Sequence, residues 1–159
     1  MKNGSICRIG KEVFRPYGEY YNIKEDNEIS SKSYHAYQTA TDIITRPLKL
    51  GITKCSNEKS FVIDSMERHL SSEEVQIVGN KPIILSVADS DPSGNPRTED
   101  VVSFLLQPGD VIVLKPGIWH DACHSTGGET MYYFLSLTNG EPSETAWLSV
   151  KPDPVSVEL

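Results

Sequence analysis

The chain has 159 residues and carries 15 Lys and Arg against 22 Asp and Glu, giving a net charge of −7 at pH 7. A chain of this length is expected to form one domain with one core, burying about two thirds of its unfolded surface. The acidic balance argues against nucleic acid or a membrane surface as the main partner, and without a bilayer-spanning or signal-like apolar run we expect a cytoplasmic protein.

The N-terminal part contains a polar segment over residues 24–33. A short helix or turn is expected around residues 11–17, and residues 24–33 are expected to be an exposed loop or a mobile lid. We therefore predict an N-terminal extension and loop over 1–33, a β-barrel over 34–150, and a C-terminal arm or edge strand over 151–159.

Short apolar runs separated by Gly, Pro and Asn turn signals recur through the rest of the chain, without an internal repeat or heptad. This spacing is typical of an all-β sandwich or barrel. The predicted strands are 48–53, 61–65, 75–78, 83–88, 101–106, 111–114, 131–137 and 147–150.

A first polar group follows the apolar residues 61–63. Strand alternation places Glu67 and His69 on one face and Arg68 on the other. Such groups are costly to bury unless they are paired or bind a metal. Glu74 reaches the same place if residues 70–72 form a bend.

A second group ends the stretch from 109 to 124. Residues 111–114 form a strand, and Lys115, Pro116 and Gly117 form a turn that delivers Trp119 and His120 on the next strand. A histidine held on such a strand is a candidate metal ligand or acid–base group. His124 follows four residues later, and Trp119 is equally consistent with core packing.

The three cysteines, Cys7, Cys55 and Cys123, are odd in number and widely spaced. This pattern predicts free thiols rather than disulfides or a paired-cysteine zinc site. Cys123, close to His124, is a candidate nucleophile, but a small buried core residue is the favoured interpretation.

Glu67, His69, Glu74 and His120 form a mixed nitrogen and oxygen donor set that suits nickel, manganese, iron or zinc. The alternative is structural: Glu67 pairs with Arg68 or a lysine, Glu74 lies on the surface, and both histidines are hydrogen-bonded in the core.

These two groups have the spacing of the cupin motifs. Gly109, Gly117 and His120 match the second motif, although Lys115 stands where proline is usual and His124 where asparagine is usual. The first motif is present as Glu67, His69 and Glu74, with Glu67 in place of its first histidine. The chain therefore resembles a cupin, which implies a single-domain double-stranded β-helix, or jelly-roll barrel.

Within the cupins, the chain is similar to the ureidoglycolate lyase (ureidoglycolate hydrolase) family. The resemblance is carried by residues 67–70 (ERHL), 119–120 (WH), Phe14 with 17–18 (YG), and 34–35 (YH). Departures from the family pattern occur at three positions: Asp121 replaces a second histidine, Glu74 a common glutamine, and the arginine expected near Lys54 is missing.

This resemblance implies cleavage of ureidoglycolate to glyoxylate and urea, a carbon–nitrogen lyase reaction of allantoin nitrogen catabolism. It also implies a homodimer and a divalent metal, nickel first, on Glu67, His69, Glu74 and His120. The alternatives are a cupin isomerase or epimerase acting on a sugar or sugar acid, and a cupin that binds a small carboxylate or carbohydrate without catalysis.

The roles expected at the site follow from the needs of this elimination. His69, His120 and Glu67 are the candidates for metal binding or acid–base work. Lys54 or Lys115 is a candidate for binding the carboxylate of a hydroxy-acid or sugar-acid substrate, and Tyr34, with His35, for the wall of the site.

Overall fold

The computed structural model describes residues 2–22, 27–30, 35–38, 48–55, 60–137 and 145–159. Over these ranges the chain is nearly all β-structure, with one short α-helix, α1 (Lys11–Phe14), and a 3₁₀ turn, η2 (Thr98–Asp100). No helix in these ranges has the length and apolar character needed to cross a bilayer.

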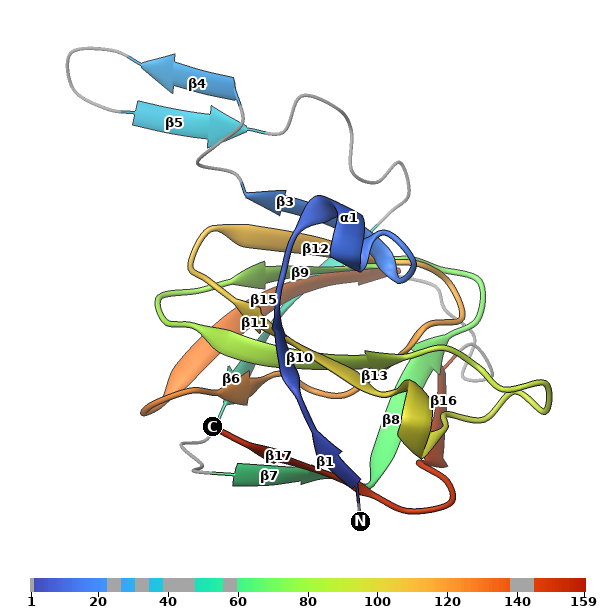
Figure 1. Cartoon of the computed structure of the whole chain (residues 1–159). Helices are drawn as coiled ribbons and strands as arrows, with labels where there is room; N and C mark the ends of the chain where they lie inside the picture. Colours follow the sequence, from blue (N-terminus) through green and yellow to red (C-terminus); the bar gives the residue numbers. More distant parts are fainter. Residues whose placement is uncertain (1, 23–26, 31–34, 39–47, 56–59, 138–144) are drawn as a thin grey trace.

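The largest sheet has seven strands in the order β16-β8-β13-β10-β11-β2, with β14 also paired to β10 (Figure 1). Its strands pair antiparallel apart from β2, which lies parallel to β11. The bounds are β2 (Ile6–Arg8), β8 (Ser65–His69), β10 (Ile83–Ala88), β11 (Val102–Leu106), β13 (Trp119–His120), β14 (His124–Ser125) and β16 (Thr145–Ser149).

A five-stranded antiparallel sheet, in the order β3-β12-β9-β15-β6, faces the large sheet. Its strands are β3 (Gly18–Asn22), β6 (Leu48–Cys55), β9 (Glu74–Val78), β12 (Asp110–Leu114) and β15 (Thr130–Leu137). A third sheet combines β1 (Lys2–Gly4), β17 (Val155–Glu158) and β7 (Ser60–Ile63). A hairpin of β4 (Asn27–Ser30) and β5 (His35–Gln38) lies apart from these sheets (Figure 1).

Two apolar cores lie on opposite faces of the large sheet, and β10 contributes to both. Ile83, Leu85 and Val87 face the five-stranded sheet, whereas Ile84 and Ala88 face the core shared with β7 and β17. This alternation is the two-residue period of a strand, and all of β10 is buried. Each large aliphatic side chain buried in this way stabilises the fold by about 1.5–3 kcal/mol. The arrangement is the predicted cupin jelly roll.

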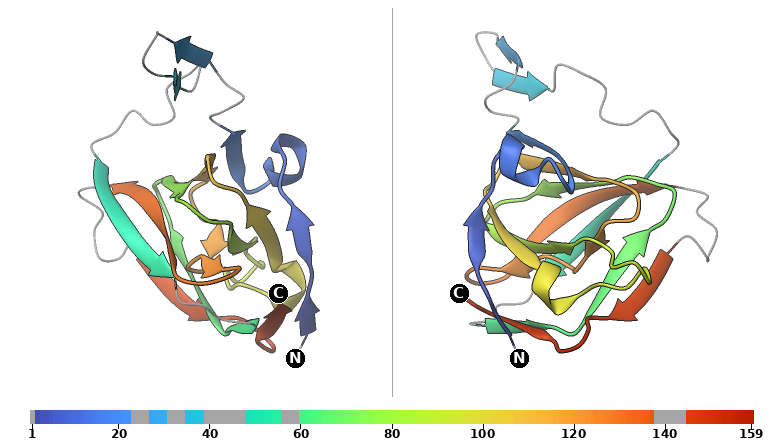
Figure 2. Two further views of the ribbon diagram at one scale, coloured as in Figure 1. Left: turned by 90° about the vertical axis from the view of Figure 1, so that its left-hand side faces the viewer. Right: turned by 45° about the vertical axis from the view of Figure 1, so that its right-hand side comes forward.

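The boundaries of the barrel differ from the expectation for residues 1–33. Strands β1, β2 and β3 pair with β17, β11 and β12, so the N-terminal residues are part of the sheets. Both views of Figure 2 show this blue segment running along the barrel. Strand β4 lies inside the stretch 24–33 that was expected to be a loop, because backbone pairing with β5 satisfies its hydrogen bonds despite a polar sequence.

Within the predicted C-terminal arm, residues 155–158 form strand β17, which is not at an edge. Strand β17 pairs with β1 on one side and β7 on the other. Val155 and Val157 are fully buried in the second core. The end of the chain therefore closes the core behind the large sheet.

The turn predicted at residues 115–117 is a type II turn. The Ile118 N–H donates to the Lys115 carbonyl at 3.3 Å, and Gly117 has a φ of +82°, which favours glycine. The Gly117 N–H also donates to the carbonyl of His69 at 2.7 Å. The turn thereby joins the two strands that carry the candidate site.

Candidate active site

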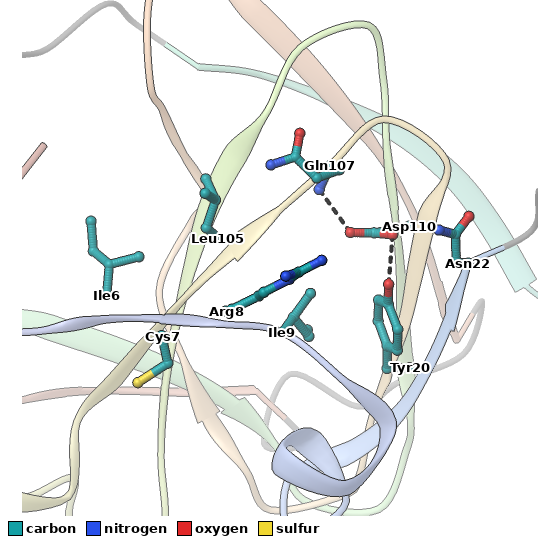
Figure 3. A pocket seen from close by; sticks show the side chains of 9 residues that line it. All are labelled: Ile6, Cys7, Arg8, Ile9, Tyr20, Asn22, Leu105, Gln107 and Asp110. Carbon is teal, nitrogen blue, oxygen red and sulfur yellow. Dashed lines mark hydrogen bonds between the residues drawn. The ribbon is translucent and has the colours of Figure 1, made fainter.

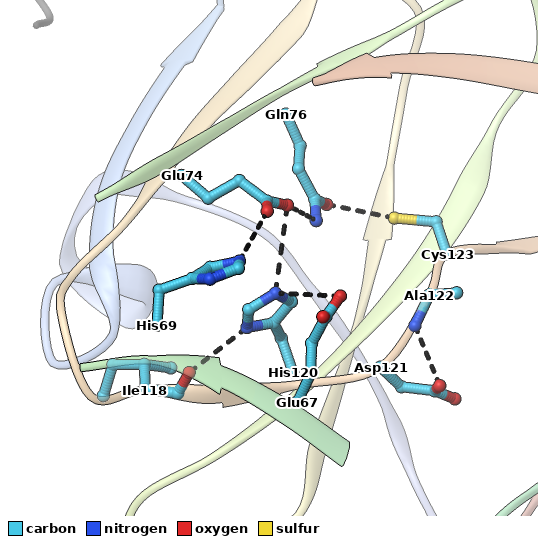
Figure 4. A network of polar contacts seen from close by, with 9 residues as sticks. All are labelled: Glu67, His69, Glu74, Gln76, Ile118, His120, Asp121, Ala122 and Cys123. Carbon is cyan, nitrogen blue, oxygen red and sulfur yellow. Dashed lines mark hydrogen bonds and ion pairs between the residues drawn. The ribbon is translucent and has the colours of Figure 1, made fainter. Parts of the chain in front are cut away.

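The structure brings together the four residues of the expected donor set (Figure 4). Glu67 and His69 extend from β8, His120 from β13 and Glu74 from the start of β9. Glu67 and His120 are directly paired across the strands, so their side chains share a face of the sheet. The cluster lies between the two facing sheets.

His69 and Glu74 are joined by a short bond. A bend at residues 70–71 returns the chain to β9, and the His69 ring Nε2 lies 2.9 Å from Glu74 Oε2. The buried Gln76 side chain donates from Nε2 to the other oxygen, Glu74 Oε1, at 2.8 Å. Both Glu74 oxygens are therefore engaged, as expected for a buried carboxylate.

His120 is the residue whose bonding is incomplete. Its ring Nδ1 lies 3.2 Å from the Ile118 carbonyl oxygen, which only accepts, so Nδ1 carries the hydrogen. Its Nε2 is buried without a hydrogen-bond partner and lies 3.7 Å from Glu67 Oε1 and 3.8 Å from Glu74 Oε1. At these distances Nε2 forms no hydrogen bond with either carboxylate, so a buried ring nitrogen is left open to a further ligand.

The pKa values of Glu67 and Glu74 shift in opposite directions, although both side chains are partly or fully buried. Burial raises the pKa of Glu67; the nearby Glu74 charge adds to this effect and His120 opposes it. Burial also disfavours ionised Glu74, but hydrogen bonds from His69 and Gln76 and the proximity of His120 outweigh it, and its pKa is lowered. Glu74 is the anchored anion, and Glu67 is the carboxylate that more readily holds a proton.

The donor atoms fit a metal ion. One atom from each of Glu67, His69 and His120 lies within 4.8 Å of the other two. Two imidazoles and a carboxylate form the mixed donor set that first-row divalent metals accept, with positions left for other ligands. The partnerless Nε2 of His120 supports the same fit.

Gln76 and Cys123 complete the network and were not foreseen as a pair. The Cys123 thiol donates to Gln76 Oε1 at 3.2 Å, which turns the amide nitrogen toward Glu74. Burial raises the pKa of Cys123 well above its ordinary value, so the structure disfavours the nucleophilic role considered for this thiol. The sequence signal was Gln76 itself, an amide two positions after Glu74 in an apolar strand.

The two candidate lysines are not in the cluster. Lys115 is exposed, and its Nζ donates to the carbonyls of Arg15 and Pro16 at 2.5 and 3.1 Å, after the end of α1. Lys54 lies on β6 beside Met131 and lines a separate pocket. Their expected contact with a substrate carboxylate gains no support from the geometry.

The other candidate residues do not lie in the cluster or are not among the residues that the structure describes. Tyr34 is outside the described residues, and His35 begins β5 away from the barrel sheets. Trp119 is fully buried in the second core, as the packing interpretation predicts, and its indole lies under Arg68 at 4.4 Å. Arg68 does not pair with Glu67 in the described contacts but donates to Ser90.

A pocket of about 500 Å³ lies away from the cluster, between β2 and β3 (Figure 3). Its buried carboxylate, Asp110, accepts hydrogen bonds from the Tyr20 hydroxyl at 2.9 Å and the Gln107 N–H at 2.7 Å. Asp110 thus has its partners within the fold, in contrast to His120.

The fold is similar to those of several sugar-nucleotide enzymes. A dTDP sugar isomerase from Desulfovibrio desulfuricans has a TM-score of 0.56 at 10% identity, covering 80% of this chain and 83% of that one. A TDP-fucose-3,4-ketoisomerase from Campylobacter jejuni has a TM-score of 0.51 at 14% identity, covering 80% and 87%. A dTDP-6-deoxy-D-glucose-3,5-epimerase from Legionella pneumophila has a TM-score of 0.51 at 9% identity, covering 76% and 68%.

Together, the jelly roll and the histidine and glutamate cluster define a cupin. Among curated proteins, none matches the chain. The family model described as ureidoglycolate lyase matches residues 5–157. The chain belongs to the ureidoglycolate lyase family, which is a family of enzymes.

Proposed function

We propose that the chain cleaves ureidoglycolate to glyoxylate and urea at the cluster of Glu67, His69, Glu74 and His120. The family match over residues 5–157 supports the reaction. The observation that carries the site is the buried Nε2 of His120, which faces two carboxylates without a partner. A buried nitrogen without a partner beside two carboxylates can bind a group that the protein itself does not supply.

The reaction is an elimination that needs neither water nor a redox partner. The O–H bond of the hydroxyl breaks and its electron pair forms the carbonyl of glyoxylate. The C–N bond breaks at the same carbon, and its electron pair goes to the ureido nitrogen, which takes up a proton as urea leaves. The site must therefore accept one proton, return one proton and hold the substrate carboxylate.

Glu67, His69 and His120 are the candidates for the proton transfers, and those that do not hold the ion perform them. Glu67 is suited to accept the hydroxyl proton because burial raises its pKa and makes it a stronger base than an ordinary glutamate. His69 is held at Nε2 by Glu74, and an imidazole can return a proton near neutral pH. Glu74 acts through His69 as a positioning residue.

Glu67, His69 and His120, with Glu74 beside them, would hold a divalent ion, and nickel is the first to test, followed by manganese, iron and zinc. When bound, the ion supplies positive charge opposite the oxygen atoms of the hydroxy-acid group. Metal analysis of wild type beside a His69→Ala, His120→Ala double variant should find about one equivalent only in wild type. Absence of metal from both after incubation with all four ions would overturn the metal assignment.

Glyoxylate release from ureidoglycolate tests the reaction. We expect activity in wild type supplied with one of the four ions and a loss of about 100-fold or more in Glu74→Gln, because His69 loses its charged partner. Glu73→Gln is the matched control, since Glu73 adjoins Glu74 in sequence but precedes β9. Absence of glyoxylate from wild type with every ion would contradict the proposed reaction, and a sugar-acid substrate would then be tested.

A homodimer is also proposed. Strand β6 is an edge of the five-stranded sheet among the described strands, and its residues Leu50 and Ile52 are 66% and 55% exposed. Pairing of two copies would cover such an edge. Sedimentation at micromolar concentration should show a species of about twice 17.7 kDa, and a single species at 17.7 kDa would contradict it.

A further inference from the structure

Strand β16 runs beside the cluster at the edge of the large sheet. Trp147 of β16 is paired with Glu67 of β8, and Glu67 is paired with His120 of β13. Directly opposed residues of antiparallel strands project from the same face of a sheet. Trp147, Glu67 and His120 therefore form one row on the face that carries the candidate site.

Exposure to solvent rises along this row. The side chain of His120 is 2% exposed and that of Glu67 is 23% exposed, while Trp147 as a residue is 53% exposed. The cluster thus becomes accessible toward β16. The row therefore leads from the buried His120 to a half-exposed indole on the edge strand β16.

The exposure of Trp147 is not explained by packing. The other tryptophan, Trp119, is fully buried, and the neighbours of Trp147 on β16 alternate to the opposite face, where Ala146 packs on the second core. A half-exposed indole next to Glu67 offers a flat apolar surface that neither accepts a proton nor carries charge.

Resting on the proposed function, we propose that Trp147 is the wall against which the planar, uncharged ureido group of the substrate stacks. The charged hydroxy-acid end belongs with the histidines and carboxylates of the cluster, so the ureido end extends toward β16. Trp147 is then a specificity-determining residue that selects substrates with a flat group next to the hydroxylated carbon.

Kinetics of glyoxylate release separate this role from a purely structural one. Trp147→Leu should raise KM about two- to tenfold with kcat nearly unchanged, and Trp147→Phe, which keeps a flat ring, should restore most of the loss. Leu148→Ala is the matched control, because Leu148 is the next residue on β16 and faces the other way. An unchanged KM in Trp147→Leu, or an equal rise in Leu148→Ala, would overturn the proposal.

Fluorescence tests the wall without turnover. Trp147 is exposed and should be quenched by acrylamide, unlike Trp119. Ureidoacetate, which lacks the hydroxyl and cannot eliminate, should protect Trp147 from quenching, whereas glycolate, which lacks the ureido group, should not. Protection by neither compound, or equally by both, would overturn the proposal. If ureidoacetate protects Trp147 but the wild type releases no glyoxylate, the stacking role of Trp147 stands and only the proposed reaction is contradicted.

Discussion

His124 and His120 each lie near carboxylates on opposite faces of the large sheet, and they differ in their hydrogen bonding. On the outer face, His124 Nε2 lies 2.9 Å from Asp121 Oδ2, and its ring stacks on Phe61 with centroids 3.7 Å apart. On the inner face, His120 Nε2 remains 3.7 Å or more from both carboxylates. Of these two histidines, only His124 lies within ordinary hydrogen-bond distance of a carboxylate.

The comparison shows that residue types alone do not identify a reactive site. His120 and His124 are four residues apart and both face carboxylates. His124 is held by partners within the fold, which suits a structural role. His120 has a buried nitrogen with no hydrogen-bond partner, which suits a functional role.

The largest expected effect is at His120. His120→Ala should lower kcat/KM for glyoxylate release by about 1000-fold and abolish the proposed metal binding, because the cluster loses a donor. His124→Ala should stay within about threefold of wild type in the same assay. Equal losses in the two variants would remove the distinction between the faces.

Gln76 gives the next effect and tests whether the inner cluster depends on its supporting bonds. Gln76→Leu should weaken metal affinity about 10- to 100-fold, because Glu74 loses the donor that orients it. Calorimetric titration with nickel measures the change. Cys123→Ser keeps a donor to Gln76 and is expected to bind metal nearly as well as wild type; an equally large loss there would point to general disruption of the core.

On the outer face, we expect a change in stability with little change in activity. His124→Ala should lower the free energy of unfolding by about 1–2 kcal/mol, since the stacking on Phe61 and the bond to Asp121 are both lost. Urea unfolding followed by circular dichroism provides the measurement. An unfolding midpoint equal to that of wild type would show that the pair contributes nothing to stability.

The smallest effect concerns thiol chemistry in the core. Burial raises the pKa of Cys55 to about 11 and that of Cys123 well above its ordinary value, so both thiols stay protonated at neutral pH. Since the thiolate is the reactive form, alkylation of Cys55 by iodoacetamide should be slow at pH 8 and should accelerate toward pH 11. Mass spectrometry of tryptic peptides follows each site, with denatured protein as the control. Rapid labelling of Cys123 at pH 8 would restore it as a candidate nucleophile.

Local patterns were sufficient to predict much of the site. Alternation placed Glu67 and His69 on one face, and the Pro116-Gly117 turn delivered His120 as expected. These predictions hold because strand period and turn geometry are set by neighbours in the sequence.

Contacts that depend on distant parts of the chain were not predictable. Lys115 is bound by carbonyls about 100 residues away, which no local pattern reveals. Gln76 meets Cys123 only because β9 and the chain after β13 face each other across the barrel. The strands β1 to β3 were missed for the same reason, since each depends on a partner late in the chain.

The contact between Arg68 and Trp119 lies directly behind the cluster. Arg68 lies between Glu67 and His69 in β8, and Trp119 precedes His120 in β13. The guanidinium covers the indole at 4.4 Å, and both groups donate to the Ser90 hydroxyl oxygen. Side chains that hold Arg68 against Trp119 also fix the distance between β8 and β13. They thereby fix the spacing of the cluster residues on the other face of the sheet. Directed evolution for higher turnover could therefore find beneficial substitutions in the second core, among residues that no substrate touches.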